Sequence, residues 1–421
     1  MLAASLSPLN RLMIALCRRD AVATITPTEL ALVADSTEWD ALLAAADAHR
    51  IDGVVLNALE RLARESVPAG RIVTQARLAP LRLLRRQAIG WDLEQSRVLA
   101  WLEKHGLTAV VLKGGALRHT AYEQSAERRV SDLDLLFDRS AIASAQSALD
   151  ALGYGDPNSA AANALYVEHH FHLQMEHPGG FKLELHWGLT PPGPHSQIDA
   201  SLVRREALRA GRAGREFLAP RSEHMVLHLA SQNTEDSFSR LGRIVDVDRV
   251  IARSQDTFDW QHLLSVATTG HLQNALGVTL RLASVLFDTP VPAGFVERLE
   301  IPWFVRANIA AMRPVEWIAE GRGGKYASVR ILMKAWLETA PGARRDIALK
   351  QMGVRRDPLR LIHAEIAEVQ RAPRTRLRNL IPGPLKVAGF QLVVWLRALT
   401  LLAGSQSRLQ MRFWDFDRSN T

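Results

Sequence analysis

The stretch that decides the fold is VVLKGGALRHTAY, residues 110–122, which is followed after five residues by RRVSDLDLLF, residues 128–137. The first piece begins inside a short β-branched run, TAVVL at 108–112, which predicts a strand. The run stops at Lys113, and Gly114 and Gly115 form a turn before a helical pattern begins. The sequence here therefore predicts a strand, a glycine turn and a helix in succession.

The second piece predicts another strand, over residues 130–137. Polar residues at 132 and 134 alternate with apolar residues at 133, 135 and 137, which is the period of a half-buried strand. Asp132 and Asp134 are two residues apart, so we expect both side chains on the same side of that strand.

Two more alternating segments follow, at 169–177 and 181–187, and they flank Pro178-Gly179-Gly180. Apolar strands joined by a Pro-Gly turn predict a β-hairpin. In the second segment, Lys182, Glu184 and His186 share one face. Glu184 is therefore a third carboxylate projecting from the polar side of a neighbouring strand.

Outside this β-rich island the pattern is mostly helical, which predicts an α+β protein in which a small mixed sheet is embedded among helices. We interpret Pro191 to Pro194 as a linker and the segment holding Gly211 and Gly214 as a polar break. The expected regions are an N-terminal helical region (1–88), the core (89–200), a helical domain (215–338) and a basic helical C-terminal region (341–421).

The charge balance and the cysteine count exclude some classes of protein but do not identify a binding partner. The 421 residues carry 52 Lys and Arg against 44 Asp and Glu, a balance of +8, which is too mild to indicate nucleic acid by itself. Cys17 is the one cysteine; it excludes an internal disulfide framework and a Cys-rich zinc module, and favours a reducing, cytoplasmic setting.

We expect no transmembrane segment. The N-terminal 20 residues lack a basic leader and a small-residue cleavage site, so they predict an amphipathic helix rather than a signal peptide. The most apolar stretch, 387–404, is interrupted by Gln391 and Arg397 and its clean apolar run is too short to cross a bilayer. A helix docked on the body is the favoured interpretation of this stretch, and a membrane-surface helix the minority one.

The strand, glycine and carboxylate features together indicate phosphate chemistry. Two glycines between a strand and a helix N-terminus let the backbone approach a phosphate. Parallel carboxylates on Asp132 and Asp134 call for a cation between them, and oxygen ligands suit Mg²⁺. With Glu184 as a third carboxylate, the pattern predicts a metal site that activates an acceptor hydroxyl and holds a triphosphate.

The same residues resemble a known family. Lys113-Gly114 with Leu117, then Arg128 with DLDLL at 132–136, then ELHW at 184–187 are similar to the motifs of the bacterial uncharacterised nucleotidyltransferase family, within the DNA polymerase β-like nucleotidyltransferase superfamily. The resemblance covers about residues 90 to 290. Two positions depart from the usual pattern: Ala116 follows the glycines where many members have a hydroxyl residue, and Glu184 stands where Asp is common.

The resemblance implies an enzyme that moves a nucleoside monophosphate from an NTP, such as ATP, to an unidentified acceptor with Mg²⁺, or alternatively Mn²⁺. It implies that Gly114 and Gly115 hold the phosphates, and that Asp132 and Asp134 bind the metal. Glu184 would bind the catalytic metal or act as the base. The remaining implied nucleotide contacts are Lys113, Arg128 and His186, since a guanidinium suits a phosphate.

Several alternatives stay open at this stage. One keeps the fold as a binding or accessory protein with weak or no catalysis, motivated by Ala116 and Glu184. Another is a toxin-like transferase acting on tRNA, with RNA contact through the basic C-terminal region. Arg129 is interpreted as a surface neighbour of Arg128.

The histidines suggest a further alternative, a zinc or iron hydrolase, for which polar lining is the favoured explanation. The residues concerned are His169, His170, His172, His177, His186 and His195. His224 and His228 have the i, i+4 spacing of a zincin pair, but Met225 stands where the catalytic glutamate would be. Asp246 and Asp248 form a second DxD on a predicted helix, where their side chains diverge. We expect a cap or inter-domain pair there, with Asp246 near the nucleotide as the alternative.

Overall fold

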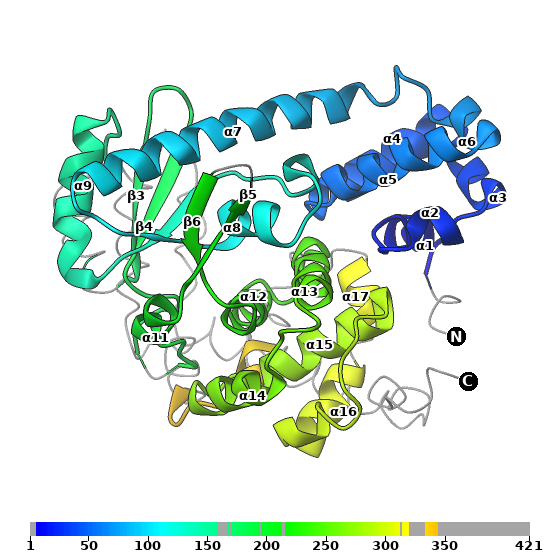
Figure 1. Ribbon diagram of the computed structural model, residues 1–421. Helices are drawn as coiled ribbons and strands as arrows, with labels where there is room; N and C mark the ends of the chain where they lie inside the picture. Colours follow the sequence, from blue (N-terminus) through cyan, green and yellow to red (C-terminus); the bar gives the residue numbers. More distant parts are fainter. Residues whose placement is uncertain are drawn as a thin grey trace, which may run out of the picture.

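The computed structural model describes residues 6–157, 167, 170–193, 195–212, 215–311, 314–319 and 333–343. Helices surround a single six-stranded mixed sheet in these ranges, which confirms the predicted α+β class (Figure 1). The basic C-terminal region and the apolar stretch at 387–404 lie outside the described residues, apart from 341–343. The predictions made for them therefore stay predictions.

Polar side chains cap the start of several N-terminal helices. Ser7, Thr26 and Asp35 each accept a hydrogen bond from a backbone N–H of the helix that follows, which satisfies donors that a helix start leaves without partners. The helices are α1 (Pro8–Leu16), α2 (Ala21–Thr24), α3 (Pro27–Leu30), α4 (Ser36–Ala48), α5 (Asp52–Glu65) and α6 (Val67–Ile72).

Helix α5 supports the segment that leads into the second predicted strand. A Cβ added to Gly53 would lie 2.2 Å from the carbonyl oxygen of Ala126, so only glycine allows this close approach. Ala126 belongs to the short 3₁₀ turn η3 (Ser125–Glu127). The N-terminal region thereby holds the backbone that immediately precedes Arg128.

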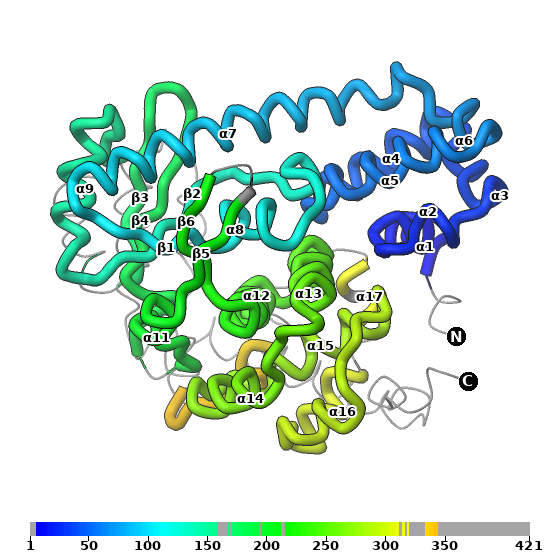
Figure 2. The backbone as a smooth tube through the Cα atoms, in the orientation of Figure 1, coloured from blue at the N-terminus to red at the C-terminus, as the bar shows by residue number. Residues whose placement is uncertain are grey.

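The long helix α7 (Ala79–Lys104) connects the N-terminal helices to the sheet. In Figures 1 and 2 it runs along the top of the molecule from α6 to α9 (Ile142–Ala151). Its glutamine Gln95 reaches the start of α8 (Lys113–Thr120), because its side-chain oxygen would lie 3.4 Å from a Cβ placed on Gly115. The helix therefore braces the glycine turn.

The sheet has the order β3-β4-β2-β1-β6-β5. Strands β2 and β4 are parallel, as are β1 and β6, whereas β1 and β2, β3 and β4, and β5 and β6 are antiparallel. The strands are β1 (Val110–Val111), β2 (Leu133–Leu136), β3 (His172–Glu176), β4 (Lys182–His186), β5 (Leu208–Arg212) and β6 (Arg215–Ala219). The predicted mixed sheet is confirmed, although each predicted strand is shorter than expected.

One interpretation was wrong for the described residues: Gly211 does not lie in a break but in β5 of the β5–β6 hairpin. The sequence pattern does not reveal these two strands because most of their side chains are exposed or charged. Among the side chains described there, only those of Phe217 and Ala219 are buried. Gly211 has a φ of 132°, and a Cβ there would lie 2.1 Å from the carbonyl oxygen of Arg215. The sheet thus extends beyond residue 200, to β6.

The helical half follows β6 directly, and Figure 2 traces the chain from this strand into α12. Its helices are α12 (Ser222–Glu235), α13 (Gly242–Arg253), α14 (Trp260–Thr269), α15 (Gln273–Phe287), α16 (Trp303–Ala311) and α17 (Pro314–Ala319). One further helix, α11 (Ala200–Arg205), lies between β4 and β5 in the chain. Buried apolar residues from Leu6 to Leu337 form one continuous cluster. The sheet and both helical regions therefore share a core, and the four-region division stays a prediction.

Among the described helices, none combines the length and the apolar character needed to cross a bilayer.

The glycine turn is held by packing as well as by backbone conformation. A Cβ on Gly115 would lie 2.7 Å from Leu133 Cδ1 and 2.9 Å from Val111 Cγ1. We expect Gly115→Ala to lower the free energy of unfolding by ~1–3 kcal/mol, the usual cost of overpacking a core. Urea unfolding measures this change. Gly90→Ala on α7 is the control, since a Cβ there meets nothing within 4 Å, and an unchanged midpoint for Gly115→Ala would contradict the packing argument.

Candidate active site

Register brings two of the predicted carboxylates side by side. Asp134 on β2 pairs with Glu184 on the parallel strand β4, so both side chains leave the same face of the sheet. Asp132 lies just before β2 rather than within it. It is nevertheless close enough to Asp134 and Glu184 to interact with them electrostatically. Burial, Asp134 and Glu184 together raise the pKa of the Asp132 carboxyl. The predicted three-carboxylate cluster is thus assembled.

Lys113 compensates part of this negative charge. Its Nζ donates to Asp134 Oδ1 at 2.5 Å and lies 3.6 Å from Glu184 Oε2. Burial lowers the pKa of the ammonium, but the two carboxylates outweigh burial and raise it. Lys113 also has a φ of 44°, in the left-handed region, which is strained for a residue with a Cβ. A strained backbone thus accompanies the contacts of this side chain with the two carboxylates.

His186 is completely buried between the same two carboxylates. Its Nε2 lies 3.0 Å from Asp134 Oδ1 and 3.1 Å from Glu184 Oε2, and its Nδ1 lies 3.2 Å from the carbonyl oxygen of Gly188. All three partners are acceptors, so both ring nitrogens must donate. Burial lowers the pKa of His186, but the bonds to Asp134 and Glu184 raise it above its ordinary value, which agrees with an imidazolium.

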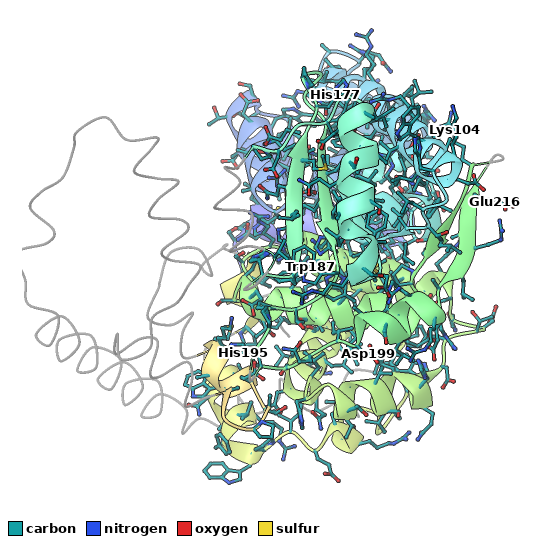
Figure 3. The ribbon with its side chains drawn as sticks, turned by 90° about the vertical axis from the view of Figure 1, so that its left-hand side faces the viewer. Lys104, His177, Trp187, His195, Asp199 and Glu216 are labelled. Carbon is teal, nitrogen blue, oxygen red and sulfur yellow. The ribbon has the colours of Figure 1, made fainter. Side chains whose placement is uncertain are left out.

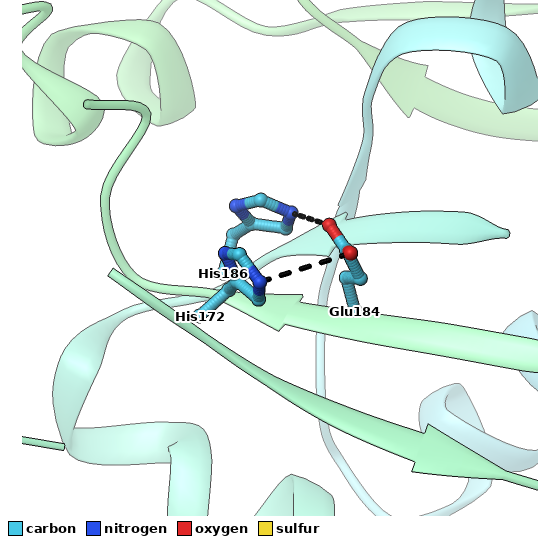
Figure 4. Close-up of side chains that lie close together, drawn as sticks. All are labelled: His172, Glu184 and His186. Carbon is cyan, nitrogen blue, oxygen red and sulfur yellow. Dashed lines mark hydrogen bonds and ion pairs between the residues drawn. The ribbon is translucent and has the colours of Figure 1, made fainter. Parts of the chain in front are cut away.

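Two residues of β3 complete the cluster around Glu184. His172 Nε2 lies 3.7 Å from Glu184 Oε1, and Gln174 donates to that same oxygen at 3.3 Å. Burial and the charge of His186 lower the pKa of His172 to about 2, so this ring is neutral. Figure 4 shows His172 and His186 approaching the two oxygens of Glu184, and ligand atoms of all three lie within 4.8 Å of one another.

Glu184 is ionised despite its burial. Burial raises its pKa, but the bond from His186 and the charge of Lys113 outweigh burial and lower it. Glu184 is therefore a poor proton acceptor and a good ligand for a cation.

The glycine turn lies beside Arg128. Gly114 and Gly115 are buried in the first turn of α8, and the N-cap residue Leu112 has no polar side chain to satisfy the N–H groups that follow. A Cβ on Gly114 would lie 3.7 Å from Arg128 Nη1. Helix N-terminus and guanidinium thus adjoin, as expected for a phosphate site, although the phosphate roles of Gly114 and Gly115 stay predictions.

Asp246 holds Arg128 in place. Arg128 Nε donates to both carboxylate oxygens of Asp246, at 2.8 and 3.0 Å, and the Tyr122 hydroxyl donates to Oδ1 at 2.6 Å. Asp246 is fully buried on α13. Of the two roles expected for Asp246, a cap or an inter-domain pair, the contacts favour a pair with a distant segment of the chain. Tyr122 carries no sequence signal for this contact, because nothing in its local sequence links it to a residue 124 positions away.

Neighbouring residues have structural roles. Asp248, on the same helix as Asp246, pairs with Arg249 and accepts from Thr289. Arg129 was taken for a simple surface neighbour, but it forms ion pairs with Asp47 and Asp52. It therefore ties the segment that leads to Asp132 to helices α4 and α5.

The remaining histidines separate into different places. Figure 3 shows His177 and Trp187 at opposite ends of the β3–β4 hairpin, and His195 beyond it. His177 Nδ1 accepts from the N–H of Gly179 and so stabilises the turn. His228 is buried within the field of Lys113 and His186, whereas His224 contacts Glu206; they form no zincin pair. His169 lies outside the described residues.

The family follows from this chain's match to a family model. The model described as Uncharacterised nucleotidyltransferase matches residues 35–288, well over half of the 421 residues. The chain therefore belongs to this nucleotidyltransferase family, and the resemblance seen in its motifs is confirmed. Its class of enzyme is nucleotidyltransferase, and its general chemistry is transfer of a nucleoside monophosphate. Searches of curated proteins and of solved structures gave no match.

The match begins at residue 35, earlier than the resemblance at about residue 90 indicated. It includes α4 and α5, whose Asp47 and Asp52 hold Arg129. Helices α4, α5 and α6 therefore lie within the region that the family model matches, whereas α1, α2 and α3 precede it.

Proposed function

We propose that this protein transfers a nucleoside monophosphate from an NTP to an acceptor hydroxyl, with Mg²⁺ held by Asp132, Asp134 and Glu184. The observation that carries the proposal is the carboxylate cluster on adjacent strands, next to the glycine turn of α8. Oxygen donors suit Mg²⁺, and burial, followed by the like charges of Asp134 and Glu184, raises the pKa of Asp132. The donor set therefore fits a divalent cation.

The bound metal would supply electrostatic stabilisation of the triphosphate and its pyrophosphate leaving group. The chain's own residues do the rest. The first turn of α8 and the Arg128 guanidinium face the same space and would bind phosphate oxygens. Lys113, whose ammonium now neutralises Asp134 and Glu184, would turn toward the phosphates once those carboxylates have a cation partner.

Asp132 lies with Asp134 and Glu184 in the proposed set of metal ligands. Burial and the two neighbouring carboxylates raise its pKa, and a bound cation would favour its ionised form instead. Glu184 has a lowered pKa, for which His186 and Lys113 are responsible, and so it serves as a ligand. Of the two roles expected for Glu184, the contacts favour metal binding.

The test is label transfer. Purified protein with Mg²⁺ is incubated with each of the four α-labelled NTPs and cell extract, and the label is followed into RNA, protein and small molecules while pyrophosphate is measured. We expect transfer that Glu184→Gln abolishes and Glu176→Gln preserves. Glu176 is the matched control because it lies on β3, is largely exposed and pairs with Lys182. Transfer that survives Glu184→Gln would refute the proposed site.

Metal affinity should depend on pH through His186. Because the pKa of His186 is raised, its imidazolium competes with a cation for Asp134 and Glu184 at low pH. As pH rises through that pKa the proton leaves, so affinity for Mn²⁺ should increase, by up to about tenfold per pH unit for one released proton. Titrations at several pH values measure this. His186→Gln should flatten the dependence, and an unchanged slope in that variant would exclude His186 as its source.

A further inference from the structure

A second cluster of metal-ligating side chains lies on elements that carry none of the active-site carboxylates. It consists of Glu206, directly after α11, His224 in the first turn of α12, and His262 in the first turn of α14. We infer that these three residues bind a divalent transition metal ion, with Zn²⁺ as the best-matched ion, and that this ion fastens three helices together. This site is independent of the proposed nucleotidyl transfer.

The three ligand atoms converge on one point. Glu206 Oε2 lies 2.9 Å from His224 Nε2 and 3.1 Å from His262 Nε2. In tetrahedral zinc sites the metal–ligand distances are about 2.0–2.1 Å, so neighbouring ligand atoms lie about 3.3 Å apart. These two separations need to open by only a few tenths of an ångström to admit the ion, and ligand atoms of all three residues lie within 4.8 Å of one another.

Hydrogen bonding within the cluster leaves His262 unsatisfied. Its Nε2 is buried and makes no hydrogen bond, although it lies 3.1 Å from Glu206 Oε2. A buried polar nitrogen without a partner is costly. A metal ion would satisfy His262 Nε2 together with His224 Nε2, and the packing supports this: the two rings meet edge to face with centroids 5.2 Å apart.

The surrounding charge favours a cation. Glu223 and Asp259 add two carboxylates, and Arg221 adds one guanidinium that pairs with Glu223. With Glu206, the formal charge is −2, which offsets the unfavourable positive ends of α12 and α14. Glu223 Oε1 also accepts from the N–H of Asp259, so α12 and α14 are already joined beside the cluster.

The donor set selects the metal. Two imidazoles and one carboxylate match zinc better than Mg²⁺, which prefers oxygen ligands alone. The side chain of His224 is 1% exposed, whereas those of Glu206 and His262 are 29% and 21% exposed. The exposed side leaves room for water as a fourth ligand.

The expected consequence of metal binding is that parts of the chain far apart in sequence are held together. Glu206 precedes β5, and His224 begins the helix that follows β6, so the ion would close the ends of the β5–β6 hairpin onto α14. One turn along α12, His228 lies buried in the field of Lys113 and His186. Fixing the start of α12 would therefore also hold the helix that backs the active site.

The experiment measures Zn²⁺ binding and thermal stability in the full chain. Because His172, Glu184 and His186 also form a potential metal cluster, the background carries Glu184→Gln. Protein freed of metal by chelation is titrated with Zn²⁺ and with Mg²⁺. We expect about one Zn²⁺ per chain, a rise in the melting temperature with Zn²⁺, and no such rise with Mg²⁺.

His262→Ala and Glu206→Gln in the same background should each weaken Zn²⁺ binding by more than about 10- to 100-fold, the effect known for removing outer-shell partners alone. Glu206→Gln keeps the shape and hydrogen-bonding capacity of the side chain, so it separates loss of metal from loss of folding. His105→Ala, at the end of α7, is the matched control. Zn²⁺ binding that is absent in the background protein, or unchanged in both variants, would overturn the site.

Discussion

Asp134→Asn is expected to lower the rate of nucleotidyl transfer by about 10³-fold or more, the scale of losing a preorganised electrostatic group. Lys113 and His186 both contact Asp134, at 2.5 and 3.0 Å, closer than they approach Glu184, so its charge has the largest part in organising the cluster. Asparagine keeps the size and one oxygen but removes the charge that holds a cation. Steady-state pyrophosphate release with Mg²⁺ and the preferred NTP measures the loss.

Asp138→Asn provides the matched control for this result. Asp138 follows the same strand, is half-exposed, and caps the next turn through Ser140, a function that asparagine also performs. It should leave the rate within a fewfold of wild type. If the Asp134→Asn protein is folded and keeps the wild-type rate, Asp134 takes no part in the reaction.

Asp246→Ala is expected to lower the free energy of unfolding by ~3–5 kcal/mol, since it leaves the Arg128 guanidinium without its buried counter-charge. The Tyr122 hydroxyl loses its acceptor at the same time. Urea unfolding followed by circular dichroism measures the change. Asp256→Ala, beyond the end of α13, is the control, and a loss below ~1 kcal/mol at Asp246 would contradict the buried-pair interpretation.

A triple variant separates stability from function at this pair. Arg128→Met, Asp246→Leu and Tyr122→Phe together replace all the polar groups by apolar ones of similar size, which often restores stability. If Arg128 binds phosphate, this variant should be stable but impaired in NTP binding, with KM raised more than kcat is lowered. If the triple variant has both the stability and the KM of the wild-type protein, Arg128 has a structural role alone.

Local sequence was sufficient to predict an element where its chemically distinctive residues also follow a strand or helix period. Alternation placed Glu184 and His186 on one strand face, and the glycine turn marked the start of α8, because strand and helix periods are properties of a short segment. The sequence pattern did not predict the β5–β6 hairpin, because a hairpin at the edge of the sheet with exposed arginines shows little apolar alternation. The carboxylates that register brings together were thus predicted, while the extent of the sheet was not.

Long-range contacts account for what was missed. Tyr122 and Asp246, or Glu206 and His262, are joined by helix packing over many residues of chain, and no spacing rule connects such pairs. For His186, the sequence indicated a polar residue beside Glu184. Its full burial between Asp134 and Glu184, and therefore its raised pKa, depend on what packs around it.

The amino-acid sequence alone was sufficient to predict the class of fold and to nominate the three carboxylates of the proposed site, because both follow from residue type and short-range periodicity. Tertiary structure decided their charge states and partners: Lys113 and His186 neutralise Asp134 and Glu184, Asp246 anchors Arg128, and Asp132 is left with a raised pKa. The physical reason is that pKa values and ion pairs depend on burial and on distances between strands and helices, which residue order does not specify.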